Sequence, residues 1–78
     1  MLYYAYMTRK SDKNNFIDIG NQIREAREEL GMTQAQVAEK AGVNVSYYAE
    51  IERGEVNPSL AKLQSIMKVV KIKNINLA

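Results

Sequence analysis

Residues 32–54 decide the fold of this chain, and they read MTQAQVAEKAGVNVSYYAEIERG. Thr33 and Gln36 have the Thr-x-x-Gln spacing of a capping box, in which each side chain hydrogen-bonds the backbone NH of the other residue. Gly42 stands where a left-handed residue ends that helix, and Asn44 follows as the N-cap of the next one. The stretch therefore predicts two short helices joined by a turn of about three residues.

Each predicted helix has one apolar side. In the first helix, small and branched side chains recur at helical spacing at Val37, Ala38 and Ala41. The second helix turns inward Tyr48 and Ile51, with Val43 just ahead of them, and Gly54 ends it. Its outward face then holds Val45, Ser46, Tyr47, Ala49 and Glu50. A short second helix with a mixed polar and apolar outer face is typical of the helix-turn-helix unit.

Two further helices are predicted around this unit. Residues 16–30 carry an apolar stripe that ends before Gly31 and consists of Phe16, Ile19, Ile23, Ala26 and Leu30. Ser59 caps a last helix whose expected buried stripe is Leu60, Leu63, Ile66, Met67 and Val70. We expect an all-α, compact four- to five-helix bundle. Residues 1–15 are expected to form an extended or disordered arm, residues 16–72 the domain, and residues 73–78 a short tail or final helical turn.

This joint pattern resembles the lambda-repressor-like (Cro-like, xenobiotic-response-element) family of helix-turn-helix DNA-binding domains. The resemblance covers residues 19–70 and rests on the runs Leu30 to Gln34, Val37-Ala38, Ala41 to Val43, Ile51 to Gly54, and Asn57 to Leu60. It implies a regulator, expected to be a repressor, that binds double-stranded DNA with the second helix of the unit in the major groove. Because one such helix reads few base pairs, a homodimer on a palindromic operator is expected.

The resemblance also implies which side chains meet the bases. The matching positions are Val45, Ser46, Ala49 and Glu50. Val45 and Ala49 would pack on thymine methyl groups, Ser46 would bond to base edges, and Glu50 would accept from a cytosine amino group. For Glu50, a solvated helix face is an equally good interpretation.

A second set is expected at the phosphates, and it consists of Gln34, Asn44, Tyr47, Arg53 and Asn57. Gln34 resembles the family's glutamine that clamps a backbone phosphate at the start of its helix. Asn44 has a complete structural explanation as a cap, and phosphate contact can accompany that role. Arg27 and Glu52 match a family ion pair between the first helix and the recognition helix, so we interpret them as scaffold.

Composition excludes several other functions. The chain has no cysteine and no histidine, so disulfides, thiolate metal sites and the commonest acid–base residue are missing, and its serines have no histidine to activate them. No phosphate loop, metal cluster or membrane span is recognisable. We therefore expect no enzymatic activity, no cofactor, no metal, no small-molecule ligand and no membrane association, and a cytoplasmic location.

Charge gives weaker support for DNA than a strongly basic domain would. The net charge is +2, but residues 16–57 carry four bases and eight acids, while residues 58–78 carry four lysines and no acid. Two alternatives therefore stay open. One is a protein-interaction module, such as a bridging coactivator or an antitoxin subunit; the other is the N-terminal domain of a longer protein. Apolar residues near the end, Val70, Ile72, Ile75 and Leu77, are expected either to complete the core or to form the dimer contact.

Overall fold

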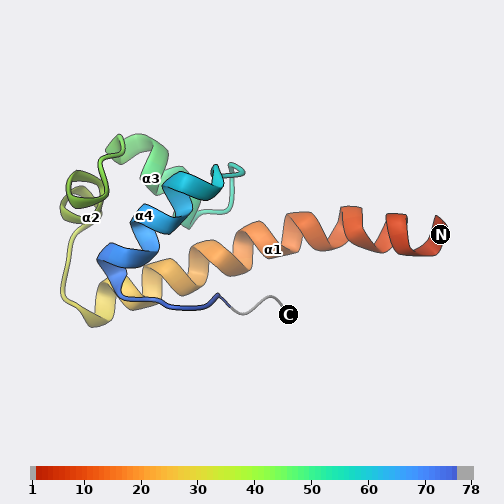
Figure 1. Ribbon diagram of the computed structural model, residues 1–78, viewed down its shortest axis with the longest axis horizontal. Helices are drawn as coiled ribbons and strands as arrows, with labels where there is room; N and C mark the ends of the chain where they lie inside the picture. Colours follow the sequence, from red (N-terminus) through yellow and green to blue (C-terminus); the bar gives the residue numbers. More distant parts are fainter. Residues whose placement is uncertain (1, 76–78) are drawn as a thin grey trace.

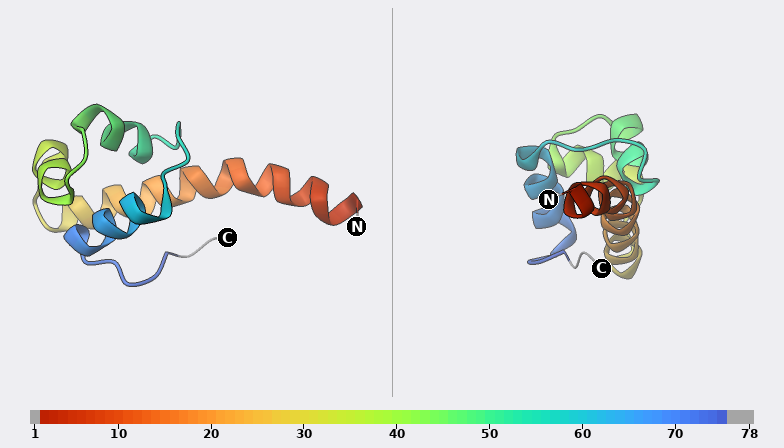
Figure 2. Two further views of the ribbon diagram at one scale, coloured as in Figure 1. Left: turned by 45° about the horizontal axis from the view of Figure 1, so that its top comes forward. Right: turned by 90° about the vertical axis from the view of Figure 1, so that its right-hand side faces the viewer.

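A computed structural model describes the backbone of residues 2–75 and the side chains of residues 15–75. Within these residues the chain forms four helices and no strand: α1 (Leu2–Glu29), α2 (Gln34–Ala41), α3 (Val45–Glu52) and α4 (Leu60–Val70). α1 packs against α3 and α4, and α2 packs against the same two helices. The three shorter helices gather around the C-terminal half of α1, whose N-terminal part extends beyond them (Figure 1, Figure 2).

The core takes side chains from all four helices. It consists of Ile23, Val37, Ala38, Tyr48, Ile51, Ile66 and Val70, each at most 2% exposed. The predicted stripes of α1, α2 and α3 supply most of this set, and Ile19, Ala26 and Ala41 pack against it. Leu60 departs from its expected place in the buried stripe, because it is the first residue of α4 and is 70% exposed.

The first helix is longer than the sequence pattern predicted. Residues 2–15 were expected to be extended or disordered, but their backbone continues α1 without a break. This segment contains neither glycine nor proline, so nothing in it stops the helix from propagating back from Phe16. The expected boundary after residue 15 followed the end of the family pattern, and α1 begins before it.

Gly20 lets α1 approach the end of α3. A Cβ atom at this position would overlap the carbonyl oxygens of Ile51 and Glu52, both of which are backbone atoms that cannot turn aside. Gly20 is itself buried. This close crossing fixes the distance between α1 and the C-terminal end of α3, and therefore the position of α3 on the core.

The chain leaves α4 through a left-handed residue. Lys71 has φ 63°, and its NH bonds to the Lys68 carbonyl, which ends the helix. Residues 73–75 are not helical, so the expected final helical turn is absent from them, and residues 76–78 lie outside the described part. Ile72 packs against the core and Val70 is part of it. Both side chains therefore help to complete the core of the monomer, which was one of the two roles expected for the apolar residues near the end of the chain.

Candidate nucleic-acid interface

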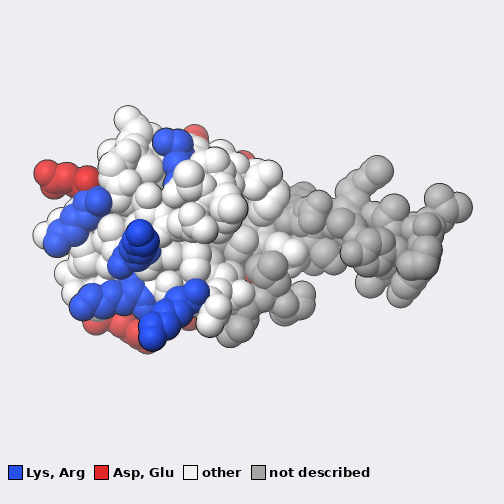
Figure 3. Space-filling model, in the orientation of Figure 1, with Lys and Arg blue, Asp and Glu red and all other residues white. Residues whose placement is uncertain are grey.

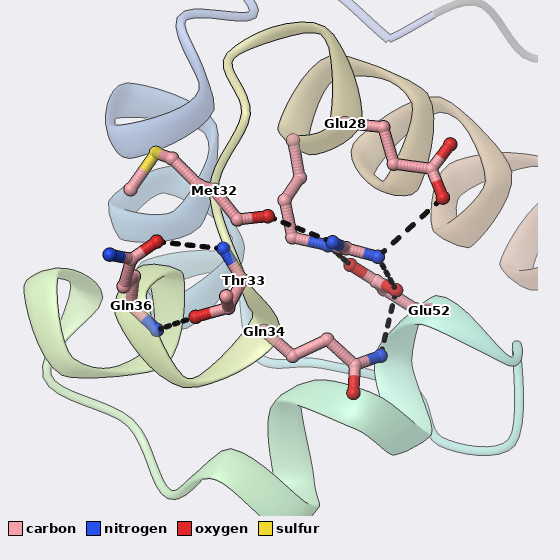
Figure 4. A network of polar contacts seen from close by, with 7 residues as sticks. Glu28, Met32, Thr33, Gln34, Gln36 and Glu52 are labelled. Carbon is pink, nitrogen blue, oxygen red and sulfur yellow. Dashed lines mark hydrogen bonds and ion pairs between the residues drawn. The ribbon is translucent and has the colours of Figure 1, made fainter.

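The two helices of the predicted unit are capped as expected. Thr33 NH donates to Gln36 Oε1 at 2.8 Å and Gln36 NH donates to Thr33 Oγ1 at 3.0 Å, which completes the capping box (Figure 4). Gly42 has φ 74°, and the following Val43 NH bonds back to the Ala38 carbonyl at 2.9 Å. Asn44 Oδ1 accepts from Ser46 NH at 2.7 Å. These contacts fix the turn between α2 and α3, and with it the direction of α3.

The outward face of α3 carries the four residues predicted to meet bases. Val45 is 44% exposed, Ser46 is exposed, and Ala49 and Glu50 are half-buried. The opposite side of the same helix is closed, because Tyr48 and the end of the helix lie in the core. The structure therefore brings Val45, Ser46, Ala49 and Glu50 together on one accessible face, and their role in reading bases stays a prediction.

Three of the residues predicted to contact phosphates lie at the α2–α3 unit. Gln34 is the first residue of α2, and its Nε2 already donates to Glu52 Oε1 at 2.9 Å. Asn44 uses its side-chain oxygen for the cap, and among the described residues its amide nitrogen has no acceptor. Tyr47 is half-buried, and Lys62 Nζ lies 5.8 Å from the centre of its ring. The Lys62 ammonium of α4 thus lies over the ring of Tyr47 in α3.

The other two lie in the segment between α3 and α4, and both are exposed. Arg53 is engaged by Glu55, with Nε to Oε2 at 2.8 Å and Nη2 to Oε1 at 3.0 Å. These hydrogen bonds raise the pKa of Arg53 and lower the pKa of Glu55. Asn57 is accessible in the loop. The predicted phosphate set is thus spread over the start of α2, the start of α3 and the loop after it.

A buried ion pair anchors α3 to α1, as the resemblance implied. Arg27 Nε donates to Glu52 Oε2 at 2.7 Å and Nη2 donates to Oε1 at 3.2 Å, and the two side chains are 13% and 3% exposed (Figure 4). Arg27 Nη1 also donates to the Met32 carbonyl at 2.9 Å. Arg27 therefore ties α1, the loop before α2 and the end of α3 together.

The environment of Glu52 keeps it ionised. Burial opposes the charge, but the hydrogen bonds from Arg27 and Gln34, with the nearby Tyr48 hydroxyl, outweigh it, so the pKa of Glu52 is lowered. Burial raises the pKa of Tyr48, and the Glu52 carboxylate adds to the rise. The Tyr48 hydroxyl lies near this carboxylate without regular hydrogen-bond geometry to any described residue. The buried end of α3 is thus a charged network with one poorly satisfied hydroxyl.

Sequence reasoning missed three contacts. Gln34 was predicted to contact phosphate only, although its side chain also donates a hydrogen bond to Glu52. The sequence feature that could have indicated this bond is an amide at the start of one helix and an acid at the end of the next. Glu55 was not singled out, although opposite charges two residues apart across a glycine are a visible pattern. Gly20 was not interpreted, although a glycine inside a helix stripe indicates close backbone approach.

Basic side chains gather on another face. Figure 3 shows Lys and Arg side chains over α4 and the segment after it, with acidic groups at the edges of the view. A cleft of about 360 Å³ lies there, lined by Gln64, Met67, Lys68, Ile72 and Lys73. In the part of the chain that the structure describes, no cluster of acidic side chains could hold a metal ion, and no helix is long and apolar enough to cross a membrane.

Comparison with known proteins identifies the family. The helix-turn-helix family model matches residues 23–73, which include α2, the turn and α3. The chain belongs to this family. The predicted lambda-repressor-like resemblance and the all-α fold are confirmed.

Similar proteins include an immunity repressor protein of Bacillus phage phi105, which is 42% identical over 55 residues, covering 70% of this chain and 38% of the repressor. The HTH-type transcriptional regulator SinR of Bacillus subtilis is 40% identical over 55 residues, covering 69% of this chain and 50% of SinR. The chain thus spans half or less of the length of these two relatives. Both are named as regulators, in agreement with the prediction that the chain is not an enzyme.

A solved structure shares the fold over nearly its whole length. The restriction-modification controller protein C.AhdI from Aeromonas hydrophila superposes with a TM-score of 0.73 at 28% sequence identity. The match covers 77% of this chain and 91% of the controller protein. The helical arrangement described above is therefore shared with this controller protein.

Proposed function

We propose that this chain binds double-stranded DNA sequence-specifically and acts as a transcriptional repressor in the cytoplasm. The observation that carries the proposal is the exposed face of α3, where Val45, Ser46, Ala49 and Glu50 stand together on a helix whose opposite side is closed by the core. A helix held in this way can enter a major groove with its first turn toward the base edges. The names of the phage immunity repressor and of SinR support the regulatory role.

The proposed phosphate contacts surround this face. Gln34 and Asn44 lie at the starts of α2 and α3, where backbone NH groups and the helix dipoles favour an anion. Tyr47 is at the edge of α3, and Arg53 and Asn57 follow it. Such contacts fix the orientation of the protein on the duplex and leave sequence choice to the four residues of α3.

We further propose a homodimer on a palindrome whose half-sites are about 34 Å apart. The described side chains that support it are fewer than the sequence indicated, because Val70 is buried and Ile72 packs on the monomer core. Ile75 is half-buried, and Leu77 lies outside the described residues. The dimer proposal therefore depends on the end of the chain and on the cleft beside α4.

Selection of bound duplexes from a random pool tests the proposal directly. A consensus with two-fold symmetry is the expected result, and it would report DNA binding, dimerisation and half-site spacing together. Affinity for the selected duplex should fall steeply as salt rises, because counterions are released from the phosphates. Failure to enrich any sequence, together with no salt-dependent binding, would favour the alternative of a protein-interaction module. The acidic side chains of Glu50 in α3 and Glu55 after it would then be part of the surface that binds protein.

A further inference from the structure

The loop after α3 holds an acid against the arginine that is proposed to contact phosphate. Glu55 accepts two hydrogen bonds from Arg53, at 2.8 and 3.0 Å, through both of its carboxylate oxygens. A phosphate group would present its oxygens to the same fork in the same way. The Arg53 fork is therefore already occupied by an oxyanion of this chain.

The turn between these two residues is fixed by the backbone. Gly54 has φ 74°, and its NH bonds to the Ile51 carbonyl at 3.0 Å, while Glu55 NH bonds to the Glu50 carbonyl at 2.9 Å. A Cβ atom on Gly54 would lie 2.8 Å from Ile17 Cγ1, so the turn also sits directly on α1. This turn returns the chain beside the end of α3 and keeps the Glu55 carboxylate within reach of Arg53.

We propose that Glu55 is a built-in competitor of DNA phosphate for Arg53, and that it lowers the affinity for every duplex without changing base preference. The inference rests on the proposed phosphate role of Arg53. Both side chains are about half exposed, at 55% and 53%, so the pair can open without stranding a buried charge. On binding, Arg53 exchanges the carboxylate for a phosphate, and the released Glu55 turns to solvent.

The expected consequence is a lower affinity for DNA in general, with the ratio of specific to non-specific affinity unchanged. Phosphate contacts contribute to non-specific and specific binding alike, so an acid that opposes one of them weakens both by the same factor. The four residues on the outward face of α3 then supply a larger share of the remaining affinity for a correct site. Glu55 thus limits binding to unrelated DNA in a chain whose net charge is positive.

The test uses the full chain, a duplex recovered by selection and a shuffled duplex of the same composition, titrated over a salt series. Glu55→Gln should tighten binding to both duplexes by the same factor, about two- to tenfold at low salt, and steepen the salt dependence by up to about one unit of slope. Glu25→Gln is the matched control, since Glu25 is an exposed acid two residues from the buried Ile23, on the far side of α1. It should change affinity far less.

A double-variant comparison separates competition from simple repulsion. In an Arg53→Ala background, Glu55→Gln should have little effect, because the competition acts through Arg53. Equal tightening by Glu55→Gln with and without Arg53 would overturn the proposal, and so would parent-like affinity of Glu55→Gln. If the parent itself binds no duplex at low salt, the proposed DNA-binding function fails, which is a result distinct from failure of the competition. Parent-like thermal unfolding of Glu55→Gln excludes a folding artefact.

Discussion

Among the described residues, two arginine–glutamate pairs are joined by two hydrogen bonds each, with nearly the same geometry and opposite surroundings. Arg27–Glu52 joins α1 to the end of α3 with side chains 13% and 3% exposed, whereas Arg53–Glu55 lies in the following loop with side chains 55% and 53% exposed. Each has an Nε hydrogen bond of 2.7 or 2.8 Å. Because the hydrogen bonds between arginine and glutamate are alike in the two pairs, the difference lies in burial and in the further hydrogen bonds from Arg27 to Met32 and from Gln34 to Glu52.

The largest effect should come from breaking the buried pair. Glu52→Ala leaves Arg27 and the Gln34 amide without their shared acceptor in a closed site, and we expect a loss of about 3–5 kcal/mol of unfolding free energy. For a domain of this size the melting temperature should fall by more than about 12 °C. Thermal unfolding followed by circular dichroism measures the change, and Glu55→Ala, which breaks the exposed pair, should melt like the parent.

A paired replacement sharpens that result. Arg27→Met combined with Glu52→Leu removes both charges and fills the space with apolar atoms, so it should recover a large part of the stability lost in Glu52→Ala. If Glu52→Ala melted with the parent, the pair would contribute nothing to the fold, and burial would not distinguish the two pairs.

The next effect concerns the helix crossing that brings the buried pair together. Gly20→Ala places a Cβ on the carbonyl oxygens of Ile51 and Glu52, so α1 and α3 must separate. We expect a net destabilisation of about 1–3 kcal/mol, because overpacking outweighs the gain in helix propensity. Urea unfolding tests this, with Glu25→Ala on the exposed side of α1 as the neutral control. A stabilised Gly20→Ala would show that propensity dominates and that the crossing is loose.

Lowering the pH should also distinguish the two pairs, with a smaller effect on stability. The pKa of Glu52 is lowered in the folded chain from an ordinary value of 4.5, so its contribution is fully present above about pH 4.5 and is lost as pH falls through the lower folded value. Urea midpoints measured between neutral and acidic pH should fall in the parent and in Glu55→Gln along parallel curves. Glu52→Gln cannot titrate at this position, so its urea midpoint should be lower at neutral pH and should fall less on acidification. A fall as steep as that of the parent would assign the acid sensitivity to other groups.

The sequence predicted the local structure better than the long-range contacts. The Thr33 capping box, the left-handed Gly42 and the Asn44 cap depend on neighbours within a few residues, so their spacing is enough to predict them. The Gly20 crossing and the Gln34–Glu52 bond join residues far apart in the chain, and no local pattern encodes the distance between them. The length of α1 was missed for a different reason, since a family pattern has no information beyond its own end.

The candidate site divides in the same way. That Val45, Ser46, Ala49 and Glu50 share an outward face follows from helical periodicity and the position of Tyr48 in the core. That Arg53 is held by Glu55 required the path of the turn at Gly54, which depends on its packing against Ile17. The sequence shows which side chains are charged. It does not show which of these charges form pairs.

The smallest effect on stability, and the most informative one on binding, should come from Arg53→Ala. Because Arg53 is exposed and its partner remains solvated, the melting temperature should stay within error of the parent. Affinity should nevertheless fall for specific and shuffled duplexes by the same factor, and the salt slope should decrease by about one, since one phosphate contact is lost.

Glu50→Gln gives the contrast, because removing a base contact should relax preference at one position per half-site by about 1–3 kcal/mol. Binding titrations over salt and selected duplex pools measure both. If Arg53→Ala instead changed the consensus while keeping non-specific affinity, Arg53 would read a base, and the exposed pair would govern sequence choice instead of affinity alone.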